Sequence, residues 1–261
     1  MKIGFIGLGN MASAIIRGIC RSPELEGVEL FGYNPSPEKL QRLQQSYRIS
    51  GCTDNVSLCR QCDVIVLAVK PQMTEAVFSE VRDSIAGKFV VSVVAGKTLA
   101  YLKERINCPI CRTAPNINAK IGASITGYCF SDDVSKSDRA LAETILSAIG
   151  ETIEVPEQFI RIVSSVGGAS PAYTYMYINA LAEAALKAGM PKEKALRLAA
   201  ASVKGSAEMV LSSGLHPYAL VDQVTSPGGS TVEGLIELQR QGFEYAVESA
   251  IEAVMEKDKK F

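Results

Sequence analysis

The segment Gly7-Leu8-Gly9-Asn10-Met11-Ala12 constrains the fold more than any other, because it joins the apolar run Lys2–Ile6 to a helix-like stretch. It matches the G-x-G-x-x-G/A pattern of a dinucleotide-binding βαβ unit. In that setting Gly7 permits the tight turn, Gly9 lets the backbone approach a pyrophosphate, and Ala12 lets the helix pack on the sheet. The N–H groups at the helix start then hold the negative charge. The sequence therefore predicts a dinucleotide site formed by these six residues.

Short apolar runs alternate with helix-like stretches through the first 155 residues. Strands are predicted at Lys2–Ile6, Val28–Tyr33, Val64–Val69, Phe89–Val94, Ile110–Arg112, Ser124–Tyr128 and Thr152–Val155. Helices are predicted at Met11–Arg21, Pro37–Gln45, Thr74–Ile85 and Lys136–Ile149. This alternation is typical of an α/β domain with helices on both faces of a parallel sheet. We expect a Rossmann-type, doubly wound parallel sheet over residues 1–155.

The extended runs stop after Pro156, and Ala-rich helical segments replace them. Gly189 is placed to end one helix, and Pro191 stands where the next can begin. Apolar residues surround much of the circumference of these helices, which favours burial against a second chain. We expect residues 156–261 to form an all-α dimerisation domain.

Composition excludes some classes of partner. Hydrophobic residues make up 47% of the chain and charged residues 21%, and 27 Lys and Arg balance 28 Asp and Glu. This balance leaves no basic footprint for nucleic acid or an anionic membrane. No run reaches the roughly 18 apolar residues of a membrane helix, and glycines interrupt the N-terminal apolar run where a signal peptide needs continuity. We expect a cytoplasmic protein that binds neither nucleic acid nor membranes.

Two cysteine pairs, Cys59 with Cys62 and Cys108 with Cys111, have the CxxC spacing of zinc half-sites. Both pairs border apolar runs, whereas zinc knuckles usually lie on exposed turns. We therefore expect buried free thiols and no bound metal. The odd total of seven cysteines also fits a reducing compartment.

The end of the second predicted strand bears on the choice of dinucleotide. An NAD-selective site usually has an acid there, which bonds the ribose 2′-hydroxyl. Here Asn34 and Ser36 stand in that region, and the first acid, Glu38, belongs to the next helix. Without a carboxylate to repel it, a 2′-phosphate can lie among Asn34, Ser36 and Lys39. We expect NADPH to be preferred, with NADH as an alternative.

A small-residue segment, Ser226-Pro227-Gly228-Gly229-Ser230-Thr231, interrupts the helical half. Ser230 and Glu233 have capping-box spacing, so a helix is predicted to begin at Ser230 or Thr231. Gly228 and Gly229 then lie just before a helix N-terminus, where free N–H groups and the helix dipole favour a small anion. The segment is predicted to bind an anionic substrate group.

Six motifs together resemble the Δ1-pyrroline-5-carboxylate reductase family. They are "IGFIGLGNMASAII", "DVIVLAVKPQ", "SVVAGKTL", "RTAPNINAKIGASITGY", "SPAYTYMYINALAEAALKAGMPKEKALRLA" and "VTSPGGSTVEGL", and the likeness covers essentially the whole chain in order. Members of that family reduce a cyclic imine to L-proline with NADPH or NADH, in the last step of proline biosynthesis. Their helical domains interleave in a homodimer, often within a decamer. The resemblance implies this reaction and this self-association here.

The resemblance also implies further cofactor residues. Asn55 matches a residue near the adenosine, and Ala95 matches one close to the nicotinamide. The segment Ala68-Val69-Lys70-Pro71 matches a loop beneath the pyrophosphate and the nicotinamide ribose. A Lys-Pro pair after a strand end is, in addition, where doubly wound sheets bind ligands. Arg112 through Asn116 matches the segment at the nicotinamide end.

For the substrate, the resemblance points to the small-residue segment, in which Ser226, Ser230 and Thr231 match a loop that binds the imine carboxylate across the dimer interface. Thr231 and Ser164 are the candidate catalytic hydroxyls. Ser164 stands where some members have a threonine near the substrate ring. Its structural alternative is a helix-internal hydroxyl that bonds its own backbone.

The demands of imine reduction fit the composition. A protonated C=N bond accepts hydride readily, so the protein must mainly hold the two reactants in register. No Ser-His-Asp or paired-carboxylate arrangement stands out in the sequence. The single histidine, His216, is expected to cap a helix or bond a loop. Tyr173, Tyr175 and Tyr177 are expected to serve packing and the interface.

Other functions remain open at this point. One is the reduction of a related cyclic imine. A second is a β-hydroxyacid dehydrogenase, although that class needs a catalytic lysine in the long helix after the Rossmann domain. Between Pro171 and Gly189 the lysine is Lys187, at the far end. A third is a non-catalytic protein that binds NADPH without oxidising it.

Overall fold

The computed structural model describes residues 1–258 and divides the chain into two compact units. Residues 1–169, together with residues 255–258, form the first unit. Residues 170–254 form the second. The first unit contains a sheet with surrounding helices and the second contains helices, so the predicted order of an α/β part followed by an all-α part is confirmed.

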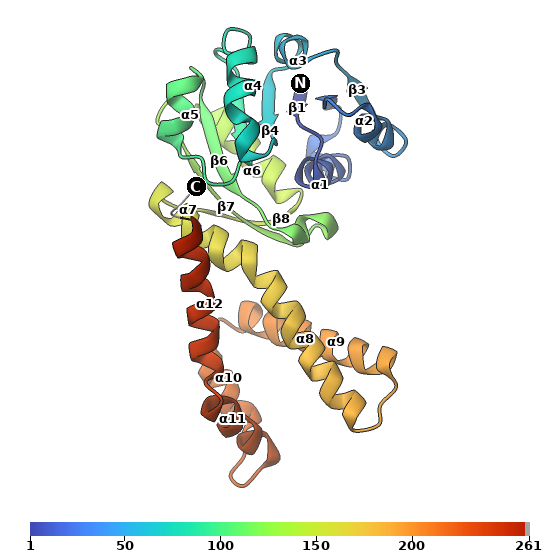
Figure 1. The fold of residues 1–261 in the computed structure, drawn as a ribbon, viewed down its shortest axis with the longest axis vertical. Helices are drawn as coiled ribbons and strands as arrows, with labels where there is room; N and C mark the ends of the chain where they lie inside the picture. Colours follow the sequence, from blue (N-terminus) through green and yellow to red (C-terminus); the bar gives the residue numbers. More distant parts are fainter. Residues whose placement is uncertain (259–261) are drawn as a thin grey trace. The chain divides into compact units, whose positions relative to one another are not determined.

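Within residues 1–258, eight strands form one sheet with the order β3-β2-β1-β4-β5-β6-β7-β8 (Figure 1). The strands are β1 (Lys2–Ile6), β2 (Glu29–Tyr33), β3 (Ile49–Gly51), β4 (Val64–Leu67), β5 (Phe89–Ser92), β6 (Ile110–Ala114), β7 (Ser124–Phe130) and β8 (Gly150–Glu154). The chain moves outward from β1 to β3 and then crosses back to β4, which lies beside β1. Ligands of doubly wound sheets bind at the carboxyl ends of the strands at such a crossover.

Helices connect the strands of the first unit. They are α1 (Asn10–Ile19), α2 (Pro37–Gln44), α3 (Asn55–Gln61), α4 (Thr74–Val81), α5 (Leu99–Arg105), α6 (Lys136–Ser147) and α7 (Ile160–Val163), with short helical turns η1 (Pro23–Leu25), η2 (Pro71–Met73), η3 (Ile117–Ile121), η4 (Glu157–Phe159) and the π-turn η5 (Ser164–Gly168). Side-chain caps start several of them. Asp54, Thr98 and Ser135 each accept the backbone N–H three residues further on, which satisfies a donor that the helix leaves unpaired.

The core of the first unit lies on both faces of the sheet because successive side chains of a strand point to opposite sides. In β4, Val64 and Val66 pack in one cluster with Phe5 and helix α1. Ile65 and Leu67 pack in the other cluster with α4. Strands buried on both faces read as continuous apolar runs, as the sequence "VIVL" does.

The structure differs from the predicted parallel sheet at one pair of strands. β7 runs antiparallel to β6, and β8 runs parallel to β7. The turn η3 joins β6 directly to β7, so there is no long crossover helix that would make this pair parallel. The remaining pairs are parallel, as predicted.

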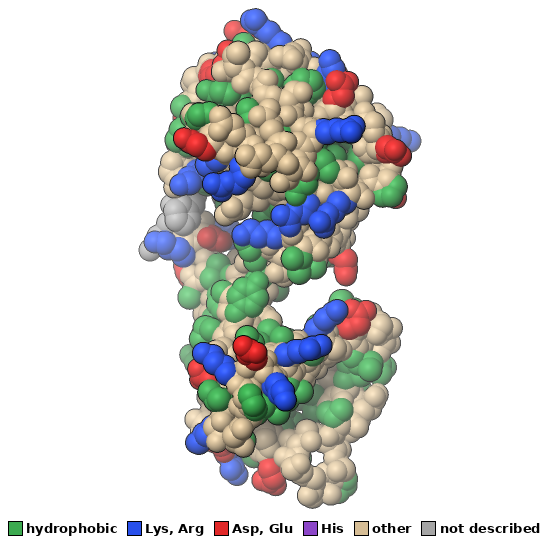
Figure 2. Space-filling model, turned by 90° about the vertical axis from the view of Figure 1, so that its right-hand side faces the viewer, with side chains coloured by type: hydrophobic (Ala, Val, Ile, Leu, Met, Phe, Trp, Pro, Cys, Tyr) green, Lys and Arg blue, Asp and Glu red, His purple; other side chains and the backbone are tan. Residues whose placement is uncertain are grey.

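The second unit consists of α8 (Ala169–Lys187), α9 (Lys192–Ser213), α10 (Pro217–Val224), α11 (Ser230–Arg240) and most of α12 (Phe243–Asp258). Its described core is small and is formed by Ala182, Ala195 and Ala199. Large apolar side chains stay exposed on the helices of this unit, among them Met176 at 73% and Tyr245 at 76% of full exposure. Figure 2 shows hydrophobic side chains at the surface of these helices. So many exposed apolar side chains favour an interaction site. No helix of the described residues is both long and apolar enough to cross a membrane.

Candidate active site

The glycine-rich turn after β1 has the backbone geometry that a bound dinucleotide needs. Gly7 has φ +88°, and a Cβ there would lie 2.8 Å from the carbonyl oxygen of Ala68. Gly9 is different, because an added Cβ would meet no heavy atom of the described chain within 4 Å. Gly9 is also the N-cap of α1, and within residues 1–258 no side chain caps that helix. The first N–H groups of α1 are therefore available to an anion, so this turn fits a pyrophosphate.

Asn34 connects the end of β2 to this turn. Its Oδ1 accepts the N–H of Leu8 at 3.2 Å, and its Nδ2 donates to the carbonyl of Ser36 at 3.2 Å. The side chain predicted to lie near the ribose thus also holds the glycine-rich turn in place. Ser36, the N-cap of α2, is exposed, and so is Lys39 in the first turn of that helix.

Asn55, the first residue of α3, is 6% exposed. Its Nδ2 donates to Oε2 of Glu80 at 2.8 Å. Its Oδ1 is buried and has no hydrogen-bond partner within the described chain. A buried acceptor without a donor is costly, and a ligand hydroxyl or amine would satisfy it. This atom fits the adenosine end of a dinucleotide.

The segment that follows β4 lies beside the glycine-rich turn. The N–H of Ala68 donates to the carbonyl of Ile6 at 2.9 Å, and the side chain of Val69 is 3.0 Å from where a Cβ on Gly7 would be. Lys70 is exposed and is the N-cap of η2, whereas the next residue, Pro71, lines a large cavity.

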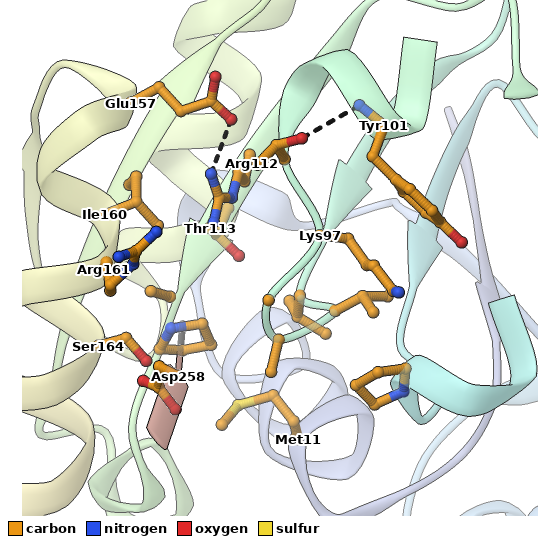
Figure 3. Close-up of a pocket in the computed structure, with 18 of the residues that line it drawn as sticks. Met11, Lys97, Tyr101, Arg112, Thr113, Glu157, Ile160, Arg161, Ser164 and Asp258 are labelled. Carbon is orange, nitrogen blue, oxygen red and sulfur yellow. Dashed lines mark hydrogen bonds and ion pairs between the residues drawn. The ribbon is translucent and has the colours of Figure 1, made fainter. Parts of the chain in front are cut away.

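That cavity, of about 940 Å³, opens at the carboxyl ends of β5 and β6 (Figure 3). It is lined by the turn 93–98 after β5, by Arg112–Pro115 in and after β6, and by residues of η4 and α7. The side chains that contribute charge or polarity include Lys97, Tyr101, Arg112, Glu157, Arg161, Ser164 and Asp258. Of the predicted site residues, the structure brings Met11, Pro71, Ala95 and Ser164 together at this cavity. Asn34, Ser36 and Asn55 do not line it.

Two clusters of charged groups include residues of the cavity wall. In the first, Nη1 of Arg112 lies 2.7 Å from Oε1 of Glu157. In the second, Tyr101 lies between two cations, with Nζ of Lys97 at 4.4 Å and the guanidinium of Arg105 at 3.7 Å from the ring centroid. The Tyr101 hydroxyl donates to Glu75, and this bond, with that from Arg105, lowers the pKa of the Glu75 carboxyl.

Sequence reasoning did not find Lys97, Tyr101, Glu157 or Arg161 as cavity residues. Tyr101 lies far from Glu75 in the sequence, and Glu157 lies 45 positions from Arg112. No local motif signals such pairs, although Glu157 directly follows Pro156 and begins η4, the first turn after the last strand, β8.

Asn116, the residue expected at the nicotinamide end, has both groups of its side-chain amide bonded within the chain. It is 5% exposed, its Nδ2 donates to the carbonyl of Gly167 at 2.9 Å, and its Oδ1 accepts the N–H of Asn118 at 2.9 Å. The amide thus caps η3 and bonds the π-turn η5. The first residue of η5 is Ser164, which lines the cavity. The neighbouring Ser165 hydroxyl, by contrast, bonds the carbonyl of Arg161 in its own helix.

The small-residue segment of the second unit turns tightly before α11. Gly228 has φ +70°, and the N–H of Gly229 donates to the carbonyl of Ser226 at 2.9 Å. The helix begins at Ser230, as predicted, but the capping box is wrong. Its N-cap is Gly229, and no side chain of the described residues caps it, because the chain turns one residue earlier than the Ser230–Glu233 spacing requires. The N–H groups that a serine cap would have occupied stay open to an anion.

Other sequence expectations concern residues outside these sites. All seven cysteines are free thiols, and Cys59, Cys62, Cys108 and Cys111 are buried as predicted. No cluster of three or more possible metal ligands occurs in the described part of the chain. Nδ1 of His216 accepts the N–H of Tyr218 at 3.2 Å and so caps α10. Tyr177 packs on Phe243 with ring centroids 5.9 Å apart.

A crossover with an uncapped glycine-rich turn, followed by helices with exposed apolar faces, defines a dinucleotide-dependent oxidoreductase with a helical association domain. Comparison with known proteins agrees. The family model "NADP oxidoreductase coenzyme F420-dependent" matches residues 2–96, and the model "Pyrroline-5-carboxylate reductase dimerisation" matches residues 157–261.

The same comparisons find close relatives. Pyrroline-5-carboxylate reductase of Escherichia coli is 39% identical over 99% of this chain and 97% of that protein, and pyrroline-5-carboxylate reductase 2 of Bacillus subtilis is 36% identical over 96% and 91%. The crystal structure of Plasmodium falciparum pyrroline carboxylate reductase with NADP bound has a TM-score of 0.88 at 32% identity, covering 100% of this chain and 97% of that one. The chain belongs to the pyrroline-5-carboxylate reductase family, whose members are NAD(P)H-dependent oxidoreductases that act on a C=N bond.

Proposed function

We propose that this chain reduces 1-pyrroline-5-carboxylate to L-proline and that NADPH is its preferred hydride donor. Membership of the family and the uncapped glycine-rich turn support the reaction and the dinucleotide. A proline-forming role would place the protein in the cytoplasm, and its seven free thiols support a reducing compartment.

The cofactor end is proposed to comprise three groups of residues. Gly7, Leu8, Gly9, Asn10, Met11 and Ala12 would hold the pyrophosphate through backbone N–H groups, with Ala68, Val69, Lys70 and Pro71 beside them. Asn34, Ser36 and Asn55 would contact the adenosine and its ribose, and Ala95 and Asn116 would flank the nicotinamide. The absence of a carboxylate beside Asn34 and Ser36 supports NADPH over NADH.

The substrate end is proposed to comprise Ser226, Gly228, Gly229, Ser230 and Thr231. The open N–H groups before α11 and the hydroxyls of this segment would bind the imine carboxylate. In the family resemblance this segment is supplied across a homodimer, and the apolar faces of α8, α9 and α12 support such pairing. Association of dimers up to a decamer belongs to the same proposal.

The chemistry then requires little from ionisable side chains. A bound NADPH would supply the hydride that the imine carbon accepts. The hydroxyls of Thr231 and Ser164 are proposed to hold the proton, directly or through water, that makes the ring nitrogen an amine. No metal is needed for this step, because protonation of the nitrogen already makes the carbon an acceptor. The protein's contribution is mainly orientation of the reacting pair.

The test is a substrate comparison with the purified protein. NADPH consumption is followed with pyrroline-5-carboxylate, with homologous cyclic imines of other ring sizes, and, in the reverse direction with NADP, with β-hydroxyacids. We expect the highest kcat/KM with pyrroline-5-carboxylate. Turnover of another imine or of a β-hydroxyacid without turnover of pyrroline-5-carboxylate would reject the assignment, and NADPH binding without any oxidation would indicate a non-catalytic protein.

A further inference from the structure

One carboxylate oxygen of Glu157 accepts hydrogen bonds from two separate parts of the cavity wall. Oε1 of Glu157 accepts the backbone N–H of Leu99 at 2.6 Å and Nη1 of Arg112 at 2.7 Å. Figure 3 shows the second of these contacts at the upper side of the cavity. The Arg112 side chain is 11% exposed and the Glu157 side chain 34% exposed. Charge-assisted hydrogen bonds in so sheltered a place are stronger than those between exposed groups.

These two contacts bracket the turn 93–98. Arg112 pairs with Ser92, the last residue of β5, so the ion pair fixes the strand from which the turn departs. The next residue, Thr113, adds a hydrogen bond from Oγ1 to the carbonyl of Ser92 at 3.1 Å. Leu99 is the first residue of α5, so its N–H fixes the point at which the turn ends.

The start of the turn is also held by the sheet and the core. The N–H of Val93 donates to the carbonyl of Leu67 at 3.0 Å, and Val94 is 2% exposed. Beyond them Ala95, Gly96 and Thr98 are exposed, and Gly96 has φ +74°, which a residue with a side chain rarely adopts. Residues 95–98 line the cavity between this buried start and the end of the turn that Glu157 holds at Leu99.

We infer that Glu157 is a positioning residue for the cofactor. Through Arg112 and Leu99 it positions residues 95–98 of the turn, against which the nicotinamide end of a bound dinucleotide would rest. The inference rests on the proposed function, because Ala95 is the residue expected beside the nicotinamide. Loss of the carboxylate frees the turn and leaves the sheltered Arg112 cation without its partner.

Glu157→Gln tests this, because the amide oxygen can still accept the Leu99 N–H while the charge is lost. We expect the dissociation constant of NADPH, measured by fluorescence without substrate, to rise about tenfold and kcat to fall about tenfold. The KM for the imine should stay within about twofold, since the proposed carboxylate segment lies elsewhere in the chain. With deuterium on the transferred position of NADPH, the isotope effect on kcat should increase, because a misplaced nicotinamide makes hydride transfer slower.

Glu154→Gln is the matched control. Glu154 also pairs with an arginine, Arg139, at 3.4 Å, but both side chains are well exposed and neither lines the cavity. We expect this variant to keep wild-type binding and kcat. A second variant, Glu157→Gln with Arg112→Gln, removes the lone cation. Its NADPH affinity should be no worse than that of Glu157→Gln, because both changes break one interaction.

The measurements distinguish failure of this inference from failure of the proposed function. If the dissociation constant and the isotope effect of Glu157→Gln stay within about twofold of wild type, the inference is overturned. It is equally overturned if only kcat and the melting temperature fall, since that pattern describes general loss of structure. Wild-type protein that binds NADPH but does not turn over pyrroline-5-carboxylate would overturn the proposed function instead, and the NADPH affinities of the variants would still test Glu157.

Discussion

Asn55 donates from Nδ2 to Glu80 at 2.8 Å, while Oδ1 of the same buried amide has no partner within the described chain. The pairing with Glu80 fixes which way the amide faces and aims its acceptor at a donor from outside the chain. A residue half satisfied in this way is prepared for a ligand.

Replacement of Asn55 by alanine should therefore weaken NADPH binding more than it destabilises the protein. A net hydrogen bond contributes about 0.5–1.5 kcal/mol, so we expect the dissociation constant to rise about threefold to tenfold. The measurement is fluorescence titration, with Asn107→Ala, an exposed asparagine, as control. Equal affinities for the two variants would show that Asn55 makes no contact with the dinucleotide.

The two glycines of the first turn should separate stability from binding. Gly7→Ala puts a side chain at φ +88° against the Ala68 carbonyl and should lower the free energy of unfolding by about 1–3 kcal/mol. Gly9→Ala has open space and should fold normally, yet weaken NADPH binding about tenfold by blocking the approach of the pyrophosphate. Thermal melts and titrations check both. A Gly9→Ala protein with wild-type affinity would contradict the site.

Thr231→Ala should affect the imine and not the dinucleotide. A hydrogen bond to a charged group contributes about 1.5–3 kcal/mol, so the KM for pyrroline-5-carboxylate should rise about tenfold or more. NADPH affinity should stay unchanged, because Thr231 is the second residue of α11 and is not among the residues proposed to bind the dinucleotide. Ser212→Ala is the control, since the Ser212 hydroxyl bonds its own helix. A collapse of NADPH affinity in Thr231→Ala would show that the two sites are divided wrongly.

The exposed apolar helices should carry the self-association. Leu211 is 67% exposed and Tyr245 is 76% exposed. Each contributes about 2 kcal/mol if buried between chains, so Leu211→Glu with Tyr245→Glu should shift the sedimentation mass toward the monomer. NADPH binding should persist while imine turnover is lost. Lys204→Glu, a charge change at an exposed position of α9, should leave the mass unchanged. An unaltered mass in the double variant would place the interface elsewhere.

The buried thiols predict a loss of stability in alkali. Burial raises the pKa of Cys59 and Cys62 from 9.0 to about 12 and that of Cys108 to about 11. Above pH 9 the unfolded chain loses these protons first, so the free energy of unfolding decreases as the pH rises, by up to about 1.4 kcal/mol per pH unit for each thiol. Melting temperatures from about pH 8 to about pH 10 should fall. The melting temperature of Cys59→Ala should fall less steeply with pH than that of the wild type. An identical slope for the two proteins would contradict this role of the Cys59 thiol.

Local sequence patterns were enough to predict much of the fold. Strands β4 and β5 are continuous apolar runs because both of their faces are buried. The glycine-rich turn could be recognised because it lies between a predicted strand and a predicted helix. Strand β3 was missed because Ile49–Gly51 is short and mostly exposed at the sheet edge. Helices α3 and α5 were missed because each has only seven residues, too few for a clear period.

The candidate site was predicted less completely than the fold. Asn55 and Ala95 came from family resemblance alone, since nothing in their own neighbourhoods indicates a ligand, whereas Lys70 and Pro71 also follow a strand end where such sheets bind ligands. Glu157, Lys97 and Tyr101 act through contacts that tertiary folding creates between distant segments. The capping box predicted at Ser230 is wrong, because Gly229 is the N-cap of α11 and Ser230 is already the first residue of the helix.

The central claim is that hydride passes from NADPH to the imine carbon of pyrroline-5-carboxylate. The most direct measurement uses NADPH that carries deuterium at the transferred position and analyses the product by mass spectrometry and NMR. We expect L-proline with one deuterium on the ring carbon next to nitrogen that was the imine carbon, in equal amount to the NADPH consumed. Consumption of NADPH without labelled proline, or no consumption with this substrate while another is reduced, would contradict the account.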